Sequence, residues 1–140
     1  MAKNNAGDLS RAHLATLVRD LQARVKSLEL QIGVRAVTFV TDTTSASGTT
    51  YARMAWSSLP RSGSTLTVDV SVTLSGASCD VQLRADGTQI GVATVTTSGT
   101  VTLTGFLPPA WEFGSRKVVD VQARVPSGSA TVALVGAWHR

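Results

Sequence analysis

Apolar residues near the N-terminus recur with the period of a helix. Six of them follow one another at alternating intervals of four and three residues: Leu14, Val18, Leu21, Val25, Leu28 and Ile32. The β-branched members occupy the a positions of a heptad repeat and the leucines occupy the d positions. We therefore predict a helix over 8–32, with Asp8 or Ser10 as its N-cap and Gly33 as its stop.

An apolar seam this narrow on a polar helix is typical of a coiled coil, in which identical helices cover it. Residues 24–29 resemble the trimerisation motif of short parallel coiled coils: Arg, an apolar residue, two free positions, an apolar residue and Glu. Arg24 at position g can reach Glu29 at position e of a neighbouring chain, so the resemblance implies a trimer. β-branched residues at a with Leu at d favour a dimer instead. A third interpretation is a single amphipathic helix on its own sheet, because Leu17 and Leu30 widen the apolar stripe.

From residue 34 onward the hydrophobic pattern changes to a period of two. It is clearest over 65–74, where Leu and Val at even positions alternate with Thr, Asp and Ser. Such alternation describes a strand with one buried and one solvated face. We predict strands at 36–41, 50–56, 65–74, 79–85, 90–96, 100–106, 117–125 and 130–138.

Turn residues separate these strands. Asp86-Gly87 and Ser127-Gly128 each predict a hairpin turn. Short strands with turns at this spacing predict an antiparallel β-sandwich, jelly-roll-like in its connections. The expected fold class is thus mainly β: an N-terminal α-helical coiled coil followed by a β-sandwich knob.

The last predicted strand is apolar on both faces, with Val132, Leu134 and Trp138 on one side and Ala133, Val135 and Ala137 on the other. A strand of this kind is covered on both sides. One interpretation puts it near a threefold axis, and the other makes it a central strand partly covered by a loop.

The predicted domains are a polar arm at 1–7, a trimeric coiled coil at 8–33 and a sandwich head at 34–140. The arm consists of Met1, Ala2, Lys3, Asn4, Asn5, Ala6 and Gly7. It has no means of ordering itself, and three copies at one end of a stalk would bind a larger assembly with avidity. We therefore expect it to anchor the protein to a partner.

Composition excludes several classes of function. The formal net charge is +4, and no Lys/Arg run is interleaved with aromatic residues, so we expect no nucleic-acid partner. No apolar run has the length of a membrane span, and no signal peptide is expected. Cys79 is the one cysteine, so no intramolecular disulfide can form, and its inward position predicts a small buried apolar group.

The sequence shows no catalytic signature, and we expect no enzymatic activity, metal or cofactor. His13 and His139 lie far apart, and the five residues Asp42, Asp69, Asp80, Asp86 and Asp120 are dispersed singly. Trp56 is expected in the core. Trp111 and Phe113 lie in a loop, where they either pack within the assembly or contact a partner or a glycan.

A polar arm, a short trimeric coil and a β-sandwich knob together resemble small structural proteins of tailed bacteriophages, such as minor tail proteins, short fibres, head fibres and decoration proteins. The resemblance is one of layout over the whole chain, and residues 24–29 are its one strict motif. It implies a homotrimer in the virion, attached through its arm to capsid or tail proteins, with an outward knob for decoration or for adsorption to a host-surface glycan. The alternative is a free, lectin-like, carbohydrate-binding trimeric module.

Overall fold

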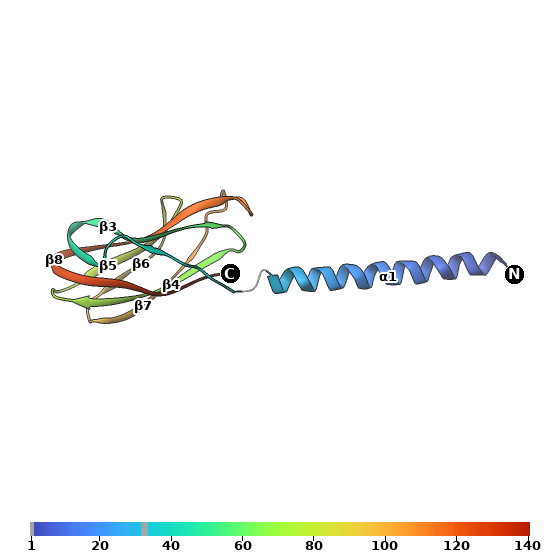
Figure 1. Cartoon of the computed structure of the whole chain (residues 1–140), viewed down its shortest axis with the longest axis horizontal. Helices are drawn as coiled ribbons and strands as arrows, with labels where there is room; N and C mark the ends of the chain where they lie inside the picture. The colour runs from blue at the N-terminus through green and yellow to red at the C-terminus, as the bar shows by residue number, and fades with distance from the viewer. Residues whose placement is uncertain (1, 32–33) are drawn as a thin grey trace. The chain divides into compact units, whose positions relative to one another are not determined.

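The computed structural model describes residues 2–31 and 34–140, with side chains described for 10–26 and 34–140. The chain divides into two compact units, residues 1–33 and residues 34–140. The first unit contains one helix and the second contains the strands (Figure 1).

The helix α1 spans Ala2–Gln31 and therefore begins earlier than the predicted start at residue 8. Residues 2–7, which the sequence predicted as an arm outside the helix, belong to its first turns. Gly7 is the one strong helix breaker among them, and a glycine costs a helix only about 1 kcal/mol relative to alanine. Every side chain over 10–26 is exposed.

The second unit contains eight strands. They are β1 (Arg35–Ala36), β2 (Val40–Thr41), β3 (Ser45–Pro60), β4 (Thr65–Leu74), β5 (Cys79–Ala85), β6 (Thr88–Val95), β7 (Gly99–Phe106) and β8 (Arg116–His139). All pairings between them are antiparallel. The structure thus confirms a mainly β fold with an antiparallel sheet.

The two layers of this sandwich share β8 (Figure 1). The first half of β8 pairs with β5 and most of β3, while its second half pairs with β4, β1 and the start of β3. The pair β5–β6 extends one layer and the pair β4–β7 extends the other. The segment at 36–41, predicted as one strand, forms two short strands with different partners: β1 pairs with β8, and β2 pairs with β3.

The hairpin predicted at Ser127-Gly128 was wrong. The two strands expected on either side of it form the single strand β8, and both halves pair with β3. Ser129 pairs with Ser47 while Val125 pairs with Gly48, so residues 126–128 form a bulge instead of a reversal. Gly128 has a φ of 89°, and the backbone of Ser75 and Gly76 lies where a side chain would be.

The turn at Asp86-Gly87 is confirmed. Ala85 pairs with Thr88, and the two turn residues have φ values of 50° and 78°. Positive φ at both central positions defines the type I′ turn, which fits the right-handed twist of a hairpin.

A second bulge explains why the last predicted strand is apolar on both faces. Gly136 pairs with Asp69 and Leu134 pairs with Val70, which leaves Val135 as an extra residue that is 65% exposed. One extra residue exchanges the two faces of a strand. Between the bulge at 126–128 and this one, the core-facing residues of β8 are even-numbered, as Ala130 and Val132 show, whereas Ala137 and His139 face the core after it. The pattern is thereby accounted for within a single chain.

The core lies between the layers and follows the predicted alternation. Its fully buried members come mainly from the inward positions of β4, β5 and the first half of β8: Leu66, Val68, Val70, Val72, Cys79, Val81, Leu83, Val119, Val121 and Val125. All of the buried core cluster belongs to the second unit.

Candidate functional site

The heptad seam of α1 is exposed in the single chain. Leu14, Val18, Leu21 and Val25 expose between 44% and 61% of their surface. Arg24 is also exposed, but the side chains of Leu28 and Glu29, and the whole of Ile32, lie outside the described residues. The side chains of the arm at 1–7 lie outside them as well. The described part of the seam forms an apolar strip along one side of the helix.

The loop between β7 and β8 separates the two aromatic residues that the sequence singled out. Trp111 is 1% exposed, and its indole N–H donates to the carbonyl of Ser115 at 2.7 Å. The guanidinium of Arg61 donates to the carbonyls of Pro108, at 3.0 Å, and Trp111. Trp111 is therefore a core residue, which corresponds to the packing alternative that the sequence left open for it.

Phe113 remains on the surface, where it is 65% exposed. The guanidinium carbon of Arg61 lies 4.5 Å from the centroid of its ring. Cation–π contact of this kind holds the ring in place while leaving one side accessible.

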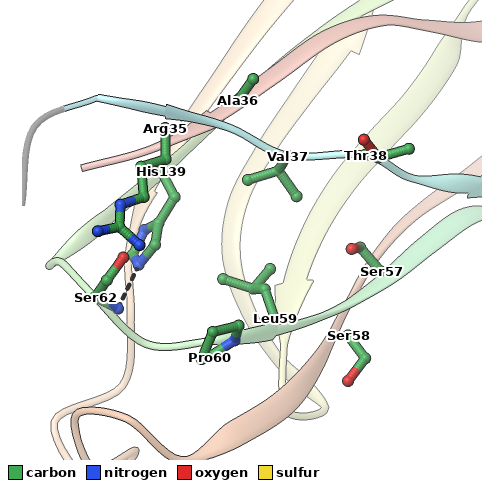
Figure 2. Close-up of a pocket in the computed structure, with 10 residues that line it drawn as sticks. All are labelled: Arg35, Ala36, Val37, Thr38, Ser57, Ser58, Leu59, Pro60, Ser62 and His139. Carbon is green, nitrogen blue, oxygen red and sulfur yellow. Dashed lines mark hydrogen bonds between the residues drawn. The ribbon is translucent and has the colours of Figure 1, made fainter. Parts of the chain in front are cut away.

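A pocket of about 300 Å³ opens between the segment at 35–38 and the end of β3 (Figure 2). Its walls are Arg35, Ala36, Val37, Thr38, Ser57, Ser58, Leu59, Pro60, Ser62 and His139. This volume is at the lower end of the range for small-molecule sites.

His139 lines this pocket together with Arg35, and backbone groups hold both of its ring nitrogens. Nδ1 lies 2.7 Å from the carbonyl oxygen of Thr65, and Nε2 accepts the N–H of Ser62 at 3.0 Å. A carbonyl can only accept, so Nδ1 donates this hydrogen bond. The lone pair that a catalytic base would use is engaged, so His139 is a structural residue here.

Within the ranges that the structure describes, no three His, Cys, Asp or Glu side chains are placed to hold a metal ion. The five dispersed aspartates each contact a neighbouring side chain instead: Arg53 for Asp42, Thr102 for Asp69, Arg124 for Asp80, Lys117 for Asp86 and Gln122 for Asp120. Burial, and then the charge of Asp80, raise the pKa of the Cys79 thiol, which disfavours the nucleophilic thiolate. No described helix is long and apolar enough to span a membrane.

The layer of β3, β8 and β5 carries an ordered array of polar and aromatic side chains on its outer face. The array has three rows, each with one residue from β5, one from β8 and one from β3: Asp80, Arg124 and Tyr51; Gln82, Gln122 and Arg53; Arg84, Asp120 and Trp56. On β5 and β8 these residues alternate with core residues, so they face away from the core. We call this array the polar face.

Hydrogen bonds fix the centre of the polar face. Nε2 of Gln82 donates to Oε1 of Gln122 at 2.6 Å, and Nε2 of Gln122 donates to Oδ2 of Asp120 at 2.8 Å. Gln82 and Asp120 are only 7% and 8% exposed.

The margins of the polar face are held by ion pairs and by aromatic contacts. Arg124 binds Asp80 at 2.9 Å and lies 4.6 Å from the ring centroid of Tyr51. The Thr94 hydroxyl, which donates to Asp80 at 2.7 Å, and then Arg124 hold the pKa of Asp80 below its ordinary value. Arg53 likewise pairs with Asp42 at 2.5 Å and lies 5.7 Å from the Trp56 ring.

Sequence reasoning missed this array as a site. The alternating pattern of 117–125 did identify the outward positions of β8, but it did not reveal which strands lie beside them. Trp56, which was expected in the core, is partly buried on the outer face opposite Asp120. A bulge at Met54 causes this, because it shifts the register of β3 between Arg53 and Ala55.

No protein-family model and no curated protein matches this chain. Among solved structures, an acetyl xylan esterase from the rumen bacterium Butyrivibrio proteoclasticus is 15% identical, with 76% of this chain and 31% of the esterase covered and a TM-score of 0.47. A carbohydrate-binding module, CBM36, in complex with calcium and xylotriose is 13% identical, with coverage of 76% and 97% and a TM-score of 0.40. The chain thus spans about a third of the length of the esterase. Likenesses this distant assign no role to any residue.

Proposed function

We propose that this protein is a non-enzymatic, homotrimeric appendage of a bacteriophage particle, in which α1 joins three chains and each sandwich is an outward knob for decoration or host adsorption. The observation that carries the proposal is the exposed heptad seam. Burying a Leu or Val side chain contributes about 1.5–3 kcal/mol, and a seam with this period is covered most completely by further copies of itself.

The number of chains follows from the motif at 24–29. A trimer lets Arg24 cover the seam with its stem and pair with Glu29 of a neighbour. The polar segment at 1–7 then stands in three copies at one end of the stalk and binds capsid or tail proteins with avidity. A free, lectin-like trimer is the second candidate, supported by the aromatic and hydrogen-bonding groups of the polar face.

The mass of the purified full-length chain tests the assembly. Light scattering should give about three times 14.6 kDa. Val25→Asp places an unpaired charge on every copy of the seam and should shift the mass to that of a monomer. Ala23→Asp, at the outward f position of the same heptad, should leave the trimer intact. A monomeric parent would overturn the proposal, and a dimeric one would show that the a and d residues outweigh the Arg–Glu motif.

Removal of residues 1–7 tests the anchor. The trimmed chain should still form a trimer with the melting temperature of the parent, but it should no longer be incorporated into the phage particle. Normal incorporation would refute the anchoring role and favour the free module.

A further inference from the structure

We propose that the polar face is a binding site for a neutral glycan chain. The proposal names a ligand class for the knob of the proposed appendage, but its geometry belongs to a single chain.

The amides and carboxylates of the polar face are fixed, yet they have spare acceptors. Oε1 of Gln82 and Oδ1 of Asp120 accept no hydrogen bond from the described residues. In that part of the chain, every fully buried side-chain nitrogen or oxygen has a partner. These two oxygens are therefore reached by solvent, on side chains that are otherwise enclosed. They offer a ligand acceptors whose positions are already set, so little entropy is lost on binding.

Sugar hydroxyl groups suit such an array because each of them both donates and accepts. The row of Gln82 and Gln122 supplies amide donors and acceptors, with arginines beside it. Outward residues of one strand repeat every two positions, so the three rows extend over about 13 Å. This length accommodates a short oligosaccharide rather than one sugar ring.

Aromatic rings stand at both ends of the array. Trp56 lies opposite Asp120 in the third row, and Tyr51 contacts Arg124 in the first row. An aromatic ring provides a flat apolar surface for the carbon face of a sugar, beside polar groups for the hydroxyls. Cation–π contacts hold both rings in place: Arg53 contacts Trp56, and Arg124 contacts Tyr51.

The charges of the polar face favour a neutral ligand. Its three arginines are accompanied by Asp80 and Asp120, and by Asp42 beside Arg53. Two of the arginines are already in ion pairs, at 2.5 and 2.9 Å. A polyanion such as a nucleic acid or a uronic-acid polymer requires a net positive surface, which this array does not present.

Titration of the full-length protein with neutral trisaccharides tests the site. We would use xylotriose, cellotriose, maltotriose and mannotriose, with polygalacturonate and heparin as acidic probes, and follow the side-chain NH₂ signals of Gln82 and Gln122 by NMR. At least one neutral trisaccharide should shift these signals, and the acidic polymers should not. Absence of any neutral binding at millimolar concentration would overturn the proposal, as would shifts confined to the pocket at His139 or to Phe113.

Matched variants separate the polar face from the rest of the knob. Trp56→Ala and Gln122→Ala should each weaken binding about tenfold or more, because each removes a stacking surface or a paired amide. Trp138→Ala, on β8 in the other layer, should change it less than about twofold. Equal losses in all three variants would contradict the assignment, provided that their melting curves match that of the parent.

The proposed trimer and the proposed glycan site can be refuted independently of each other. A monomeric parent that still shows the glutamine shifts would remove the appendage and keep the site. A trimeric parent with no shifts would do the reverse, and the polar face would then be an inert or protein-binding surface.

Discussion

Trp111 shows how a residue in a loop becomes part of the core. The segment around it contains Pro108, Pro109 and Gly114, which exclude regular structure. Its ring is nevertheless fully enclosed, and its indole N–H and its carbonyl are both hydrogen-bonded. The polar groups that usually keep a loop at the surface are satisfied here, chiefly by Ser115 and Arg61.

Trp111→Ala should therefore lower the free energy of unfolding by about 3–5 kcal/mol, the usual cost of removing a buried Trp. Phe113→Ala, two residues along the same loop, should cost less than about 1 kcal/mol, because it removes an exposed ring and one cation–π contact. Urea denaturation of both variants measures the difference. Similar costs would mean that the loop does not hold Trp111 in the core.

Asp80 makes the free energy of unfolding of the sandwich depend on pH in the acidic range. Its pKa is lower in the folded chain than in the unfolded one, where an aspartate carboxyl has a pKa of about 3.9. The carboxylate thus contributes stability at pH values above about 4, and this contribution is lost as the pH falls through the lowered pKa of the folded state.

In Asp80→Asn this pH-dependent part should be absent. The variant should be less stable than the parent at neutral pH, and the gap should narrow steadily below about pH 4. Denaturation curves of both proteins from about pH 7 to about pH 2 measure it. A gap that is constant over this range would show that folding does not lower the pKa of Asp80, so that Thr94 and Arg124 stabilise its protonated and ionised forms equally.

At the scale of elements, β6 and β7 meet closely where the two layers come together. A methyl group at Gly105 would lie 2.4 Å from the carbonyl oxygen of Ile90. Backbone atoms cannot yield as a flexible side chain can, so this glycine is needed for the approach of the two strands.

Gly105→Ala should lower the free energy of unfolding by about 1–3 kcal/mol through overpacking. Gly99→Ala is the matched control, because it lies on the same strand and its added methyl would meet nothing within 4 Å. It should be neutral or slightly stabilising, since alanine restricts the unfolded chain. Thermal melts of the pair give the comparison, and an unaffected Gly105→Ala would mean that the strands can separate at no cost.

The whole molecule consists of a helix that is exposed along its described side chains and a sandwich that contains the entire core cluster. Residues 34–140 are numerous enough to form a domain with its own core. The two units therefore have different sources of stability: the sandwich from its own packing, and the helix from the copies that cover its seam.

Deletion of residues 1–33 should leave a sandwich that unfolds cooperatively but associates more weakly than the full chain. Differential scanning calorimetry and light scattering measure the two properties. A fragment without a cooperative transition would show that the sandwich needs the helix. A fragment that remains fully trimeric would transfer the trimer interface to the knob.

Features that depend on neighbouring residues were predictable from the sequence alone. The period of the apolar residues placed the helix, the strands at 65–74 and 79–85 and the alternation of the core, because side-chain direction follows directly from the local backbone. The Asp86-Gly87 turn was predictable for the same reason, since its φ values are a local property of those residues.

Features that depend on pairing between distant segments arise from the three-dimensional fold. Ser127-Gly128 has the local chemistry of a turn, yet pairing with β3 on both sides keeps β8 continuous. Single-residue bulges at Met54 and Val135 exchange the faces of their strands, and one of them moves Trp56 out of the core. The polar face arises in the same way. Its residues are outward on each strand, but they form an array only because β5 and β3 lie on either side of β8, an order that depends on long-range packing and that no local pattern contains.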